Sequence, residues 1–98
     1  MNIQAMMKQA QQLQKKMMEE KKSIDSKSFT GKSSLVSVTM TGEKKVTDVS
    51  ISMDEIGSDD KEMLEDMIML AVNDAITQID KETEDKMGKY TQGLPGLF

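Results

Sequence analysis

The chain has 98 residues, a formal net charge of −4, and neither Cys nor His. Its length suits one domain with a modest core, and the lack of cysteine excludes disulfides. Without Cys or His it cannot build Ser-His or Cys-His nucleophiles or the usual zinc sites, so we expect no enzyme, no metal and no cofactor.

The first predicted helix covers residues 2–23. Its segment MMKQAQQLQKKMMEEKK, residues 6–22, has no Gly, Pro or β-branched residue, which favours a helix. Apolar side chains at spacings of 3 and 4 form a seam of coiled-coil type, interrupted at Glu20. The other predicted helix is committed to a sheet, so we expect this seam to contact a second copy of the chain. The predicted dimer contacts are Ile3, Met6, Ala10, Leu13 and Met17.

Lysines form a row along the same helix. Lys8, Lys15 and Lys22 are seven residues apart, which places them opposite the seam over about 21 Å. The row could be the solvated face of a coiled coil, or an arm that binds phosphates; a membrane-surface helix would need larger apolar side chains. The chain has no Arg, so any DNA contact should favour the backbone over base edges. The candidate DNA-binding residues are Lys8, Lys15, Lys16, Lys21, Lys22, Lys44 and Lys45.

A small antiparallel sheet follows the helix. Residues 25–34 are rich in turn formers, with a short strand expected around Phe29. Alternation predicts two further strands, joined by a turn at residues 42–44 that contains Lys44. GKSS at 31–34 lacks the first glycine of a phosphate loop and precedes a strand, so we expect no small-molecule substrate. The predicted buried face comprises Val36, Val38, Met40, Val49, Ile51 and Met53.

The second predicted helix begins after a cap at Ser58 or Asp59 and runs to about Met87, where Gly88 suits a C-terminal stop. Residues 67–72 are apolar all round, which predicts deep burial. The fold class is therefore α+β: a long N-terminal helix, a sheet of two or three strands and a long C-terminal helix, in a dimer with projecting helices. We expect one α-β-β(-β)-α domain over residues 1–87 and a flexible tail over 88–98.

Charge divides the chain into two halves. Residues 1–45 hold nine lysines and four acidic residues, whereas residues 46–98 hold four lysines and thirteen acidic residues. The acidic second helix or the tail could therefore serve a protein–protein interaction module, which is the alternative function. No 18-residue apolar run exists and the N-terminus lacks a signal-peptide core, so we expect no membrane contact and a cytoplasmic location.

Four segments together resemble the YbaB/EbfC family of bacterial nucleoid-associated proteins. They are MMKQAQQLQKKM, FTGKSSLVSVTMTGEKKVTDVSIS, DKEMLEDMIMLAVNDA and the closing GLPGLF. The resemblance covers nearly the whole chain. It implies a cytoplasmic homodimer whose helices project like tweezers around double-stranded DNA, and a role in organising the nucleoid with possible gene regulation.

Overall fold

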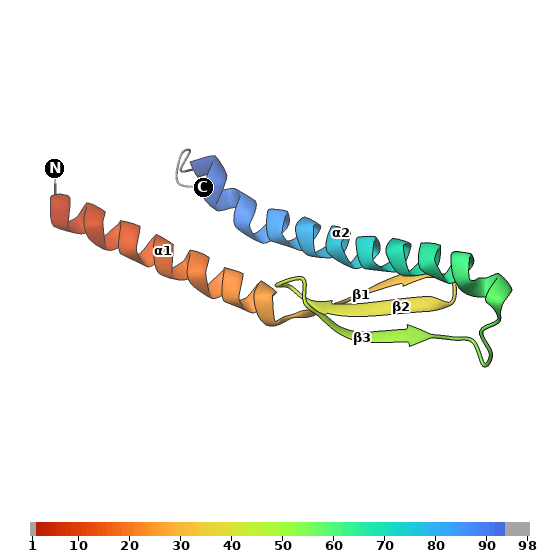
Figure 1. Cartoon of the computed structure of the whole chain (residues 1–98). Coiled ribbons are helices and arrows are strands. Elements are labelled where there is room, and N and C mark those ends of the chain that lie inside the picture. The colour runs from red at the N-terminus through yellow and green to blue at the C-terminus, as the bar shows by residue number, and fades with distance from the viewer. Residues whose placement is uncertain (1, 94–98) are drawn as a thin grey trace.

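The structure, a computed structural model, describes the backbone of residues 2–93 and the side chains of residues 2–90. Helix α1 (Ile3–Ser26) leads into strands β1 (Ser28–Ser33), β2 (Val36–Thr41) and β3 (Val46–Ile51). A short 3-10 turn, η1 (Ser58–Asp60), precedes helix α2 (Lys61–Gly93). The predicted α+β fold is confirmed, with three strands in the sheet. The molecule is elongated, with a longest dimension of 71 Å, because much of α1 projects beyond the sheet (Figure 1).

The sheet is antiparallel throughout, in the order β1-β2-β3. Phe29 pairs with Met40, and Val38 pairs with Val49. Alternate residues of β2 point to the same face, so Val36, Val38 and Met40 are all buried, as the alternation predicts. The chain turns between β2 and β3 after Thr41, where Lys44 adopts a positive φ of 67°.

Helix α2 covers the sheet over β1 and β2 (Figure 1). Its apolar stripe contributes the buried residues Leu64, Ala71, Ala75 and Ile79. Gly31 of β1 lies directly beneath this helix, where a Cβ atom would collide with the backbone of Ala71 and Ala75. Small side chains on α2 and a glycine on β1 therefore allow the helix to approach the sheet closely.

The prediction of a fully buried apolar face is wrong for β3. Val49 shares the face of its β2 neighbours, yet it is 50% exposed, because no part of α2 lies over β3. The prediction that residues 67–72 are deeply buried is also wrong. Met69 and Leu70 lie on the side of α2 away from the core and are each 54% exposed. In the described part of the single chain, β3 and α2 thus each keep exposed apolar side chains that no other element covers.

The predicted ends of the second helix need correction. The acidic residues at 59 and 60 belong to η1, and α2 begins at Lys61. Gly88 does not stop the helix, which continues to Gly93, because later residues of α2 still pack against α1. The predicted tail therefore begins inside the helix, and its last five residues, 94–98, lie outside the described residues.

Candidate nucleic-acid interface

Helix α1 is built from strong helix formers. Asn2 caps it, since its Oδ1 accepts a hydrogen bond of 3.2 Å from the Ala5 backbone N–H. Of its 24 residues only Ile24 is buried, so most of the helix contacts solvent rather than the core. The helix therefore forms an arm that starts in the body of the protein and leaves it.

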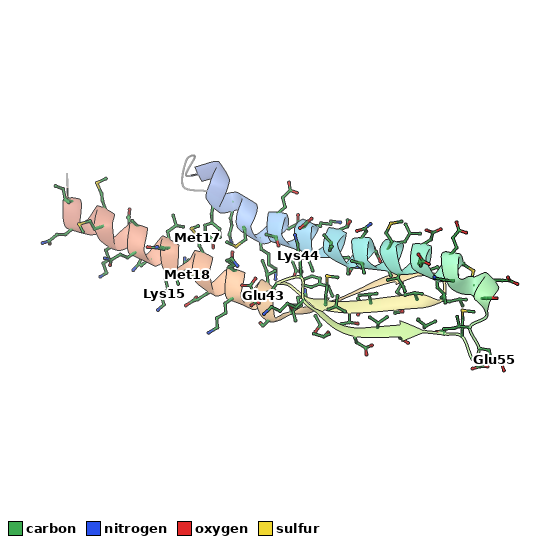
Figure 2. The ribbon with its side chains drawn as sticks, in the orientation of Figure 1. Lys15, Met17, Met18, Glu43, Lys44 and Glu55 are labelled. Carbon is green, nitrogen blue, oxygen red and sulfur yellow. The ribbon has the colours of Figure 1, made fainter. Side chains whose placement is uncertain are left out.

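The lysine row lies on the outer side of this arm. Lys8, Lys15 and Lys22 are exposed, and Figure 2 shows Lys15 pointing away from α2 whereas Met17 lies on the side that faces α2. Lys16 is exposed beside the row. Within residues 2–93, no carboxylate lies within ion-pair distance of these four ammonium groups. We call Lys8, Lys15 and Lys22 the lysine row; Lys16 lies beside it, towards Lys89 and Tyr90 of α2.

The other three candidate lysines each have an acidic neighbour. Lys21 pairs with Asp25 at 3.0 Å, one turn along α1. Lys44 pairs with Asp80 of α2 at 3.2 Å, and Lys45 pairs with Glu43 in the hairpin turn at 3.5 Å. All three lysines are exposed, so these pairs are weak and screened by salt. The spacing of four residues on one helix was a signal for the Lys21–Asp25 pair, whereas no local spacing indicates the Lys44–Asp80 pair. These pairs separate the three lysines from the lysine row.

The residues predicted to form the dimer contact fall into two groups. Leu13 and Met17 are partly buried. Met17 lies on the side of α1 that faces α2 (Figure 2), and Leu13, four residues earlier, shares that side of the helix. Ile3 and Met6 are 68% and 54% exposed, and Ala10 is exposed too. The inner part of the seam thus packs within the chain, while its outer part is uncovered.

Two ion pairs join the start of the arm to α2. Glu20 Oε1 lies 3.1 Å from Lys89 Nζ, and Lys27 Nζ lies 2.7 Å from Glu82 Oε1. Hydrogen bonding from Lys89 is the main cause that lowers the pKa of Glu20, and hydrogen bonding from Lys27 does the same for Glu82. The sequence carried one signal of this contact, the acidic Glu20 in an otherwise apolar seam.

Tyr90 completes the contact between the helices. It is 5% exposed, and the Lys89 ammonium group lies 5.1 Å from its ring centroid. Burial is the main cause that raises the pKa of the Tyr90 hydroxyl, with a further contribution from Glu20. An aromatic ring, a carboxylate and an ammonium group thus meet where α1 leaves α2.

Two kinds of site are not found in the described part of the chain, a cluster of metal ligands and a membrane-spanning helix. Among residues 2–93, no group of three or more acidic side chains is placed to hold a metal ion. Neither helix has a stretch in its described part that is long and apolar enough to cross a bilayer. The lysine row is therefore the feature whose chemistry most clearly suits a ligand.

Comparison with known proteins gives a consistent result. The model of the YbaB/EbfC DNA-binding family matches residues 1–94. A nucleoid-associated protein of Ligilactobacillus salivarius is 46% identical, over 99% of this chain and 95% of its own length. Nucleoid-associated proteins of Lactococcus lactis subsp. cremoris (strain MG1363) and Enterococcus faecalis are 48% and 43% identical, over 97% and 98% of this chain and 98% and 94% of their own lengths. The chain therefore belongs to the YbaB/EbfC DNA-binding family.

Proposed function

We propose that this protein is a nucleoid-associated protein that binds duplex DNA without catalysis, and that it does so through the lysine row on the outer face of α1. The observation that carries the proposal is the row of three exposed lysines with no carboxylate partner within the described residues. Membership of a DNA-binding family supports it. The expected locations are the cytoplasm and the nucleoid.

The chemistry of the row favours contact with phosphates. Each ammonium group is a point charge that neutralises a phosphate and releases a counterion, and the chain has no Arg to read guanine in a bidentate manner. Affinity should therefore depend weakly on sequence and strongly on salt. With two arms of three lysines each on one duplex, about six phosphates are neutralised, and log K should fall with log salt at a slope of about −5.

The position of the acidic residues agrees with this use of α1. The acidic start of α2 lies at the opposite end of the molecule from the N-terminus of α1 (Figure 1). The longest dimension of 71 Å far exceeds the screening length of about 8 Å at physiological salt. The acidic residues at the start of α2 therefore do not cancel the local positive potential of the outer part of the arm.

We propose further that two copies associate, so that two arms contact one duplex. Val46 and Val49 of the edge strand β3 are each about half exposed, and Met69 on α2 is 54% exposed. These apolar residues need a cover, and a second copy can supply one. The seam residues Ile3, Met6, Ala10, Leu13 and Met17 stay a predicted dimer contact, with its outer half available. Two linked arms would bind more tightly than one and could constrain the path of the DNA.

The direct test is retention of a duplex by the variant K8Q/K15Q/K22Q. The expected result is loss of most binding, equal for unrelated sequences, with a clearly shallower salt slope, because each lost phosphate contact removes about 0.9 from the slope. The matched control is K61Q/K81Q/K86Q, which removes the same charge from exposed lysines of α2. Equal binding by the parent and K8Q/K15Q/K22Q would rule out α1 as the DNA-binding arm.

The alternative function, a protein–protein interaction module, has one specific observation in its favour. Residues 54–66 hold seven acidic residues and one lysine, and Ile56 and Met63 are exposed among them. Such a surface suits a basic, partly apolar partner. This function would be favoured if the parent protein captures partners from nuclease-treated lysate and the variant E62Q/E65Q/D66N does not retain them. Partners that disappear with nuclease would favour DNA binding.

A further inference from the structure

We infer that Glu20, Lys89 and Tyr90 act as positioning residues that fix the direction in which α1 leaves the body, and thereby aim the lysine row. We call this contact the arm latch. Its value for DNA binding rests on the proposed function, whereas its effect on the direction of α1 does not. Three features of α1 matter here: the residue that anchors its base, the contacts that it makes with α2 farther out, and the length of its free end.

The base of α1 is held at a single buried point. Ile24 is 3% exposed and belongs to the core. Gly42, in the turn after β2, lies so close that a Cβ atom would collide with the Ile24 carbonyl, and its N–H donates a hydrogen bond of 3.1 Å to the Lys27 carbonyl. A helix held at one fully buried residue can still tilt about that residue, so its direction depends on contacts farther out, at Glu20 and at the partly buried Met17.

The arm latch supplies the contact at Glu20, one helical turn outward. Glu20 occupies a seam position where an apolar residue is expected, and its carboxylate reaches Lys89 Nζ across the helix interface at 3.1 Å. Lys89 in turn lies over the ring of the buried Tyr90. A carboxylate in such a position is unfavourable without a cation beside it, so the pair depends on the two helices keeping this separation.

The lysine row cannot be an extension of this contact. Around Glu20 and Lys89 lie the side chains of Lys16 and Glu19, and Lys86 also attracts the Glu20 carboxylate. The neighbouring pair joins Lys27, at the base of α1, to Glu82 of α2. Lys27 and Lys89 already face carboxylates, so they are poorly suited to hold a phosphate, and the two pairs are well suited to hold the helices together.

The geometry of the arm amplifies small movements at the latch. Measured along the helix from Ile24, Glu20 is about 6 Å away and Lys8 about 24 Å away. A tilt that moves Glu20 by about 1 Å therefore moves Lys8 by about 4 Å. Such a movement is longer than an ammonium–phosphate hydrogen bond, so it would separate Lys8 from a phosphate that it contacts.

The test compares E20K with E19K. Both substitutions change the charge of α1 equally, but Glu19 is exposed and has no ion pair within the described residues. Because the natural chain has no cysteine, Q9C and N73C can carry a spin label each, with labelled chains diluted in unlabelled protein to isolate distances within one chain. In E20K the distance between the labels should shift or broaden by about 4 Å or more, since two like charges then oppose each other at the latch.

E19K should keep the parent distance, and the charge swap E20K/K89E should restore it. The isosteric E20Q, which folds more readily, should give a smaller change in the same direction as E20K. Identical distance distributions in E20K, E20Q and E19K would overturn the inference. The inference would also be overturned if E20K/K89E did not restore the parent distance between the labels.

DNA retention separates this inference from the proposed function. Charge alone predicts that E20K binds DNA more tightly than the parent, because α1 gains two units of positive charge. A mispositioned arm predicts that E20K binds about 3- to 10-fold more weakly than the parent despite that gain, because the lysine row is no longer preorganised. If the distances change as expected while K8Q/K15Q/K22Q retains DNA like the parent, the arm latch stands and the proposed DNA site fails. Unchanged distances would refute the latch, whatever the DNA result.

Discussion

The molecule has two regions that are stabilised in different ways. One is the sheet together with the first half of α2, and the other is the projecting part of α1. In the sheet, side chains such as Val36, Val38 and Met40 are almost fully buried beneath α2. Along the 24 residues of α1, only Ile24 is buried. The first region is therefore held by tertiary packing and the second mainly by helix propensity and an N-terminal cap.

This contrast suits two different tasks. A packed body gives a rigid base and, with its uncovered β3 surface, a place for a second copy. An exposed arm keeps its lysines available for a ligand, at the cost of low local stability. We expect substitutions in the body to change the free energy of global unfolding, and substitutions in the outer part of α1 to change function or local order instead.

The largest expected effect is that of G31A. The added methyl group would collide with the backbone of Ala71 and Ala75, so α2 must move away from β1. We expect the free energy of unfolding to fall by about 5 kcal/mol, above the usual range of about 1–3 kcal/mol for overpacking, because backbone atoms cannot step aside. The measurement is chemical denaturation followed by circular dichroism.

The matched control for G31A is G88A. Gly88 lies inside α2, and its added Cβ would come no closer than 4.0 Å to Glu84 Cγ. Alanine is the better helix former, so G88A should stabilise the protein by about 0.5–1 kcal/mol. Similar losses of stability in both variants would mean that close helix–sheet contact at Gly31 does not hold the body together.

The next effect compares two methionines, one from each region. Met40 is 1% exposed in the core, and M40A should cost about 2–5 kcal/mol of unfolding free energy, through lost burial and a cavity. Met7 is 57% exposed on α1, and M7A should change stability by less than about 0.5 kcal/mol. A large loss in M7A would show that this face of α1 is covered in solution, and a concentration-dependent loss would identify a second copy as the cover.

Much of the fold was predictable because its elements have clear periodicity. The alternation of Val36, Val38 and Met40 indicated β2 and its buried face. The exposure of Val49 was not predictable, since a pattern tells which face is apolar but not whether a helix lies over it. Gly88 misled the prediction for a similar reason, because packing of α2 against α1 continues beyond it and outweighs a poor helix former.

The candidate site was predictable only in its local part. Spacing alone aligned Lys8, Lys15 and Lys22, because helical neighbours are fixed by the chain itself. The partners of Lys44 and Glu20 lie 36 and 69 residues away, at Asp80 and Lys89, and no local pattern specifies such pairings. The sequence thus identified the charged groups, and the fold decided which of them are free to bind a ligand.

The smallest expected effect belongs to the end of the arm. In N2A the hydrogen bond from the Ala5 N–H to Asn2 Oδ1 is lost, which should cost about 1 kcal/mol of helix stability. Since Ile3 and Met6 are exposed, nothing described couples this end to the core, and the first turn of α1 should fray without a change in the thermal midpoint. Faster hydrogen exchange at residues 5–7, compared with the exposed-site control Q9A, is the expected result. A lowered midpoint in N2A would mean that the tip of the arm is packed against something in solution. In that case the two regions differ less than the single chain suggests.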